Sequence, residues 1–201
     1  MKREESNLIK SNFIGSWHSS NDKIFDDLID YFEINSHLHR QGMMGGGRID
    51  HQNKKTTDIT INPIDIEKKN NLIFRDYFSI LFDCYNNYKK EWPFVAEKFQ
   101  CVDIPSFNLQ RYLPGDHFSK LHTERSAVPN MHRIFAWMTY LNNVSEEAEG
   151  CTYFSHFGIK IKPEKGKTLI WPAEWTHAHL GETLKKEKKY IITGWMCFPF
   201  N

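Results

Sequence analysis

The 201-residue chain lacks the cysteine pairs, charge imbalance and long apolar runs that mark several classes of protein. Its four cysteines form no CxxC pair, which predicts free thiols in a reducing cytoplasm. Lys and Arg number 26 against 25 Asp and Glu, so the net charge of +1 gives no general attraction for nucleic acid or an anionic membrane. No run approaches a membrane-spanning length, and the polar start "MKREESNLIK" does not resemble a signal peptide. We therefore expect a cytoplasmic protein with no nucleic-acid or membrane partner.

The residues that are abundant favour a packed globule. Aromatic side chains make up 14% of the chain, with fifteen Phe and six Trp. A length of 201 residues suits one domain with its own apolar core, and we find no internal repeat or linker. We expect a single domain over residues 1–201.

The first half of the chain has helical periodicity in two segments, 21–33 and 68–92, the second ending before Pro93. The apolar positions that set this periodicity are Ile24, Leu28 and Tyr31 or Phe32 in the first segment, and Leu72, Phe78, Leu81, Phe82 and Tyr85 in the second. Between them, 42–58 is polar and contains three successive glycines, which predicts a long loop or a strand with a mobile tip. This loop is either a lid over a substrate or a plain connection.

From Ile104 onward the pattern changes to short β-prone runs separated by turn signals such as Pro114-Gly115. The runs cover 106–113, 132–142, 151–155, 166–171 and 189–198. Helices followed by strands favour the α+β class, with helices packed on an all-β sandwich or barrel. We expect helical support over about 1–103 and a β core over about 104–201.

The sequence "LHTERS" contains a His-x-Glu pair, His122 and Glu124. In an extended strand, residues i and i+2 point to the same face, so the imidazole and carboxylate converge while Thr123 points away. One more histidine from a distant strand would complete two His and one carboxylate, the ligand set of non-haem Fe(II) oxygenases. The alternative is an accidental pair on the surface.

The last β-prone run begins with a charged residue on an otherwise apolar face. Lys189, Ile191, Thr193 and Trp195 alternate along one side of "KYIITGW". Lys189 is either the end of the solvated run "KKEKK" or a buried cation that pairs with an anion, because an unpaired buried ammonium is costly. Thr193 could then donate its hydroxyl to the same anion.

The second half of the chain resembles the 2-oxoglutarate/Fe(II)-dependent oxygenases, and specifically the prolyl 4-hydroxylase-like branch. The resemblance rests on ordered motifs over 108–198: Tyr112, Gly115, Phe118, His122 and Glu124; then Tyr140-Leu141-Asn142; then Gly150 before Tyr153-Phe154; then His179-Leu180-Gly181, Lys189, Tyr190, Thr193 and Trp195. It implies a double-stranded β-helix (jelly-roll, cupin-like) core with N-terminal supporting helices. It also implies an Fe(II)- and 2-oxoglutarate-dependent dioxygenase.

The resemblance further implies the roles of individual residues. His122, Glu124 and His179 would hold Fe(II), with O2 and 2-oxoglutarate as cosubstrates. The distal carboxylate of 2-oxoglutarate would meet Lys189, with Tyr140 and Thr193 as hydrogen-bond donors. Tyr112 would line the cosubstrate pocket or fill the barrel, and Trp195 would be core or substrate wall.

Two histidines compete for the distal ligand position. His177 and His179 have the same strand parity, so both could face inward, but the ten-residue interval to Lys189 in the family pattern fits His179. His177 would then be a substrate-side residue, a support for His179 or a rim histidine. The reverse assignment has the two histidines exchange roles.

Two features depart from the family pattern. The carboxylate is Glu124, one methylene longer than the usual Asp, and one extra residue lies between the Gly115 turn and His122. We expect a bulge or a longer turn to absorb the extra residue.

The resemblance favours hydroxylation of a prolyl side chain in a peptide or protein, with release of succinate and CO2. The alternatives are a small molecule or free amino acid as substrate, and a jelly-roll module that binds metal without turnover. A nucleic-acid demethylase shares the fold, but the chain lacks a basic and aromatic groove signature.

Overall fold

The computed structural model describes residues 2–3, 12–45 and 47–199. The strands are β1 (Lys2–Arg3), β2 (Gly15–His18), β3 (Arg40–Gln41), β4 (Thr57–Ile61), β5 (Phe107–Tyr112), β6 (Phe118–His122), β7 (Arg133–Tyr140), β8 (Thr152–Phe154), β9 (Ile159–Ile161), β10 (Lys167–Pro172), β11 (His179–Gly181) and β12 (Lys189–Cys197). The helices with α geometry are α2 (Asp22–Ile34), α3 (Leu72–Glu91) and α4 (Pro93–Lys98). The α+β class expected from the sequence is confirmed.

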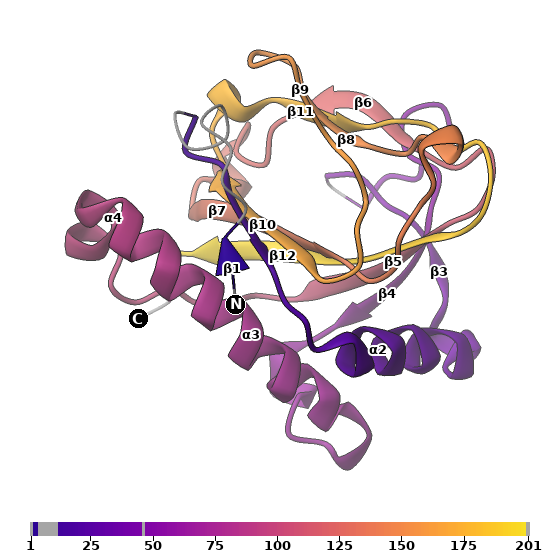
Figure 1. Ribbon diagram of the computed structural model, residues 1–201, viewed down its shortest axis with the longest axis horizontal. Coiled ribbons are helices and arrows are strands. Elements are labelled where there is room, and N and C mark those ends of the chain that lie inside the picture. The colour runs from indigo at the N-terminus through magenta and orange to yellow at the C-terminus, as the bar shows by residue number, and fades with distance from the viewer. Residues whose placement is uncertain (1, 4–11, 46, 200–201) are drawn as a thin grey trace.

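The strands form two antiparallel sheets that face each other (Figure 1). The large sheet has the order β1-β2-β10-β7-β12-β5-β4-β3, and the small sheet has the order β6-β11-β8-β9. This is the double-stranded β-helix arrangement. Strand β12 lies near the middle of the large sheet, paired with β5 on one side and β7 on the other, so the side chains on its inner face lie inside the fold.

The helices cover the outer face of the large sheet (Figure 1). Helix α3 buries a stripe at helical spacing, formed by Phe74, Tyr77, Phe78, Leu81, Cys84, Tyr85 and Tyr88. The predicted stripe was wrong at Phe82, which is 39% exposed because it lies beside this row. Pro93 ends α3 as predicted and occupies the first turn of α4, where its missing N–H costs nothing.

The N-terminal part supplies strands as well as the expected helices. Strand β2 pairs with β10, and β4 pairs with β5, so both extend the large sheet. The segment 42–58 is therefore a loop only in part, since β4 begins at Thr57 and Lys55 bridges to His117. These strands are short and gain their hydrogen bonds from distant partners, which is why local periodicity did not predict them.

Two apolar cores result, one on each side of the large sheet. The first lies between the helices and the sheet, and the second lies between the two sheets. Polar residues also enter the second space, because Lys189 and His179 are buried there with Tyr112 and Tyr140. The candidate site lies at this polar part of the interior.

Candidate active site

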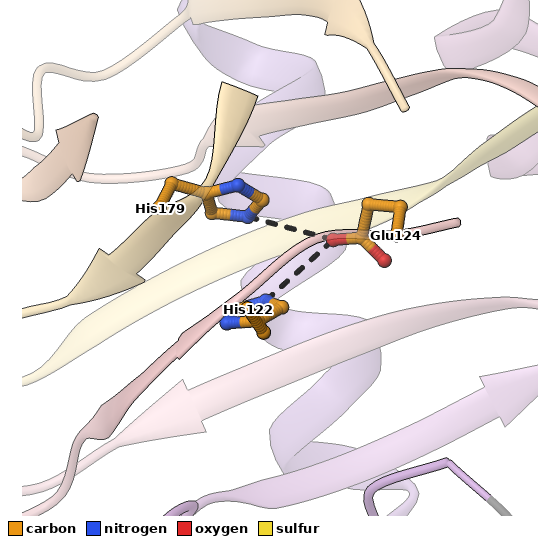
Figure 2. A group of neighbouring side chains, drawn as sticks. All are labelled: His122, Glu124 and His179. Carbon is orange, nitrogen blue, oxygen red and sulfur yellow. Dashed lines mark ion pairs between the residues drawn. The ribbon is translucent and has the colours of Figure 1, made fainter. Parts of the chain in front are cut away.

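Three side chains with metal-binding atoms converge between the two sheets. His122, Glu124 and His179 each offer one such atom, and these atoms all lie within 4.8 Å of one another. Oε1 of Glu124 is 3.6 Å from Nε2 of His122 and 3.4 Å from Nε2 of His179. Figure 2 shows the two imidazoles pointing at the same carboxylate oxygen from neighbouring strands.

The sheet register brings the two histidines together. His179 in β11 is the partner of His122 in β6, although they lie 57 residues apart in the sequence. Glu124 follows two residues after the end of β6, and Thr123 turns away to donate its hydroxyl to the carbonyl of Ala173 at 2.8 Å. The alternation predicted for His122, Thr123 and Glu124 is therefore present.

Backbone carbonyls fix which nitrogen of each histidine is available. Nδ1 of His122 lies 2.8 Å from the carbonyl of Lys120, and Nδ1 of His179 lies 2.9 Å from the carbonyl of His177. A carbonyl only accepts, so each Nδ1 carries a proton, and a ring in its neutral form presents the Nε2 lone pair. Burial, and then the neighbouring His122, lower the pKa of His179, which favours this neutral form.

A bulge lies in β6 between Phe118 and His122, within the interval that holds the extra residue. Gly181 pairs with Phe118 and His179 pairs with His122, so two steps along β11 match four steps along β6. The bulge also places the carbonyl of Lys120 where it orients the His122 ring. The ring of Phe118 stacks on the same imidazole, with centroids 3.9 Å apart.

The carboxylate of Glu124 is held on its other side by two residues. Oε2 accepts a hydrogen bond of 2.7 Å from the indole Nε1 of Trp195, and it lies 3.6 Å from a guanidinium nitrogen of Arg133. Burial alone would raise the pKa of Glu124, but hydrogen bonding and charge from His122 and His179, in the protonated forms of these rings, hold that pKa well below its usual range. The carboxylate is ionised at neutral pH.

His177 points away from this group. It lies in a 3-10 turn, 175–177, and not in a strand, so the parity argument that it shares a face with His179 was wrong. Its Nε2 donates to the carbonyl of Asn12 at 2.8 Å, and its Nδ1 accepts from the hydroxyl of Thr176 at 2.9 Å. Both ring nitrogens are thus engaged, and only the backbone carbonyl of His177 serves His179.

Lys189 is a buried cation without a carboxylate partner among the described residues. Its side chain donates to the carbonyl of Gly150 at 2.7 Å and lies 4.2 Å from the centroid of the Tyr112 ring. The residue is 3% exposed, and burial lowers the pKa of its ammonium to about 8. A buried cation that lacks a counterion is the environment expected for a site that receives an anionic ligand.

The hydroxyls of the other predicted cosubstrate residues already have partners. The Tyr140 hydroxyl donates to Thr152 Oγ1 at 2.7 Å, and that of Thr193 donates to the carbonyl of Trp137 at 2.8 Å. Tyr140 is fully buried, whereas Thr193 lines the open groove described below. Hydrogen bonding to a carboxylate would require either hydroxyl to rotate.

Sequence reasoning missed a polar chain that leads to Tyr112. The Tyr112 hydroxyl donates to Oε1 of Gln110 at 3.0 Å, and Nε2 of Gln110 donates to Asp58 at 3.0 Å. Asp58 forms a buried ion pair of 3.0 Å with Lys54, which also donates to the carbonyl of Met43. Because an ionised carboxylate only accepts, Asp58 fixes the orientation of Gln110 and leaves Oε1 of Gln110 to accept the Tyr112 proton. Lys54 and Asp58 lie within the polar 42–58 segment, and no sequence signal marked their burial.

An open groove leads from the surface to the group. Its volume is about 890 Å³, and it is lined by β5, by the segment after β3, by β6 and the residues that follow it, and by Thr193 and Trp195 of β12. His122 and Glu124 line the groove, whereas His179 and Lys189 lie behind it in the buried interior. The group is therefore reachable from outside.

The donor set fits a divalent iron ion. Two neutral imidazole nitrogens and one carboxylate oxygen on one side of a metal leave coordination positions for other ligands, which is the pattern of non-haem Fe(II) oxygenases. The carbonyls that orient both imidazoles are the usual supporting contacts of metal-ligating histidines.

Comparisons with known proteins agree with this reading. Residues 107–197 match the family model described as 2OG-Fe(II) oxygenase superfamily. No curated protein matches the chain. That superfamily uses Fe(II), 2-oxoglutarate and O2, so the cofactors expected from the sequence are confirmed at the level of the family.

Several solved structures with the same fold are prolyl hydroxylases. A viral collagen prolyl hydroxylase of Paramecium Bursaria Chlorella virus-1, in a 2-oxoglutarate complex, is 17% identical, covers 96% of this chain and 100% of its own, and has a TM-score of 0.68. A Pseudomonas putida prolyl-4-hydroxylase is 13% identical, covers 94% and 95%, and scores 0.73. A prolyl hydroxylase from Trichoplax adhaerens, in complex with a hypoxia inducible factor peptide fragment, is 15% identical, covers 95% and 86%, and scores 0.72.

These likenesses establish the double-stranded β-helix fold of the prolyl hydroxylase type over 94–96% of the chain. The family match covers His122, Glu124, His179 and Lys189. The match over 107–197 and the arrangement of these residues support a 2-oxoglutarate-dependent Fe(II) dioxygenase of the 2OG-Fe(II) oxygenase superfamily.

Proposed function

We propose that the protein hydroxylates a C–H bond of a prolyl side chain in a peptide or protein. The observation that carries this proposal is the His122, Glu124 and His179 group, which meets an open groove in front and a buried, unpaired Lys189 behind. Fe(II) bound to the group supplies the oxidation of the C–H bond by O2, coupled to conversion of 2-oxoglutarate into succinate and CO2.

A metal would be held by His122 and His179 through their Nε2 atoms and by Glu124 through Oε1. The Nδ1 hydrogen bonds prevent the rings from turning, so both lone pairs stay aimed at the same point. Glu124, ionised at neutral pH, partly neutralises the ion. Its negative charge and the low pKa of His179 favour metal over protons at these ligand atoms.

Lys189 binds the distal carboxylate of 2-oxoglutarate. The ammonium needs only to exchange a neutral carbonyl partner, Gly150, for a charged one, and such a contact is stronger. Tyr112 and Tyr140 form the walls beside this ammonium, and Thr193 and Trp195 lie farther along the same strand face toward the groove. His177 has no direct part in this site.

The shape of the groove supports a peptide over a free amino acid. Its lining includes Met43 and Leu121, each 49% exposed. Exposed apolar side chains at the edge of an open groove suit an extended partner that covers them. The fold likeness to prolyl hydroxylases supports proline as the residue oxidised.

The cytoplasm is the proposed compartment. All four cysteines are free, which fits a reducing environment, and no helix among the described residues could cross a membrane.

Succinate formation from 2-oxoglutarate in the presence of Fe(II) tests the activity, with and without proline-containing peptide pools. Peptides that stimulate turnover should gain 16 Da by mass spectrometry, located to a prolyl residue. Stimulation by free amino acids alone would replace the peptide by a small-molecule substrate. Fe(II) binding without any 2-oxoglutarate turnover would contradict the proposed function.

A further inference from the structure

Glu124 uses its two carboxylate oxygens for different contacts. Oε1 faces Nε2 of His122 and of His179, at 3.6 and 3.4 Å. Oε2 faces the opposite way and accepts the indole N–H of Trp195 at 2.7 Å. Only Oε1 is therefore directed at the position that the two imidazoles share.

Trp195 is itself held in place by Arg133. The guanidinium carbon of Arg133 lies 3.6 Å from the centroid of the indole ring, which is the distance of a stacked pair. The same guanidinium lies 3.6 Å from Oε2, so the cation and the indole N–H act on one carboxylate oxygen. Stacking fixes the plane of the indole and so the direction of its N–H.

The backbone that carries Glu124 is anchored on both sides. Arg133 donates to the carbonyl of Glu124 at 3.0 Å, and the preceding Thr123 donates its hydroxyl to the carbonyl of Ala173 at 2.8 Å. With the backbone fixed, the length of the side chain decides how far the carboxylate extends. An aspartate at this position would end one methylene earlier and could not reach both the imidazole pair and Trp195.

We propose that Trp195 and Arg133 are positioning residues for Glu124. Because of them, this site requires a glutamate as its carboxylate ligand, whereas the family usually has the shorter aspartate. Trp195 holds Oε2, which leaves Oε1 as the single oxygen for the metal, and Arg133 fixes both the indole and the Glu124 backbone. This proposal rests on the metal-binding role of Glu124 in the proposed function.

A double-mutant cycle on metal binding tests the proposal without any turnover. Co(II) replaces Fe(II) as an air-stable probe, with affinity measured by calorimetry and ligand geometry by the visible spectrum of the bound ion. Trp195→Phe keeps an aromatic ring for Arg133 but removes the N–H, and it should weaken Co(II) binding by about 10- to 100-fold. Glu124→Asp should weaken it to a similar degree and change the spectrum.

The combined variant separates positioning from general damage. In Glu124→Asp the carboxylate no longer reaches the indole, so adding Trp195→Phe should cost nothing further. Trp175→Phe, which removes an indole N–H from a side chain 67% exposed, should bind Co(II) like the wild type. Thermal unfolding of every variant without metal verifies that each is folded.

Three results would overturn the proposal: Glu124→Asp binding Co(II) as tightly as the wild type, Trp195→Phe binding it normally, or full additivity in the double variant. Glu124→Ala distinguishes these results from failure of the site itself. If Glu124→Ala also binds Co(II) normally, Glu124 is not a ligand, and the metal site of the proposed function is wrong.

Discussion

His122 and His179 lie directly opposite each other across the β6–β11 pair, and each ring is held by the carbonyl two residues before it. The ring centroids are 4.4 Å apart, and the Nδ1 contacts are 2.8 Å to Lys120 and 2.9 Å to His177. Two strands thus repeat one local arrangement, in which a backbone carbonyl sets the tautomer and leaves Nε2 for a metal.

This arrangement predicts opposite results for the two neighbouring histidines. His179→Ala removes a ligand atom and should weaken Co(II) or Fe(II) binding by more than about 100-fold. This loss of affinity exceeds the loss of about 10- to 100-fold that is typical when only a residue that supports a ligand is removed. His177→Ala keeps the carbonyl that orients His179, so its metal affinity should stay within about threefold of the wild type. Calorimetric titration of both variants checks this. If His179→Ala bound the metal tightly and His177→Ala did not bind it, His177 and not His179 would be the metal ligand.

Removal of the buried ammonium should affect the cosubstrate and not the metal. Lys189→Ala deletes the counter-charge for the distal carboxylate, a contact worth about 1.5–3 kcal/mol. We expect the dissociation constant for 2-oxoglutarate to rise by about 10- to 100-fold, with Co(II) affinity unchanged. Titration of 2-oxoglutarate into the Co(II)-loaded protein measures this. An unchanged constant would show that Lys189 does not contact the cosubstrate.

The affinity for 2-oxoglutarate should fall as the pH rises. Burial lowers the pKa of Lys189 from 10.5 to about 8, so in the free protein the ammonium is charged below pH 8 and neutral above it. Carboxylate binding requires the charged form, so affinity is greatest below pH 8 and falls by about tenfold per pH unit above it. Lys189→Arg stays charged and should remove this dependence. A flat wild-type profile between pH 7 and 9.5 would contradict the prediction.

The buried pair of Lys54 and Asp58 should matter more for the site than for stability. Asp58→Asn leaves a buried lysine without its counter-charge and should destabilise the fold by about 3 kcal/mol. The double variant Lys54→Met/Asp58→Leu removes both charges and should recover most of that stability. It also frees Gln110 and Tyr112 to reorient, so 2-oxoglutarate should bind several-fold more weakly.

Denaturant unfolding and cosubstrate titration on the same two variants separate the effects. A double variant with wild-type stability and wild-type 2-oxoglutarate affinity would show that the chain from Asp58 to Tyr112 does not position the cosubstrate site.

The strands of the second half could be predicted because each has its own local pattern. Alternation and turn residues marked β5, β7, β8, β10 and β12, and helical spacing marked α2 and α3. Strands β2 and β4 escaped notice because their hydrogen bonds come from β10 and β5, far away in the sequence. A short strand of this kind exists only when its partner is present.

The sequence by itself identified candidate residues from local geometry. In an extended strand His122 and Glu124 share a face because they are two residues apart, whereas for Lys189 the sequence left both a solvated turn and a buried cation open. The resemblance to the oxygenases added His179 through its interval to Lys189.

Only the tertiary structure decided which groups surround these residues. His177 shares its parity with His179 on paper, yet a 3-10 turn directs its ring to the carbonyl of Asn12, 165 residues away. Glu124 meets the indole of Trp195, 71 residues away. Such contacts depend on the register of the sheets and on turns that bring distant parts of the chain together. Neither can be predicted from the spacing of neighbouring residues in the sequence.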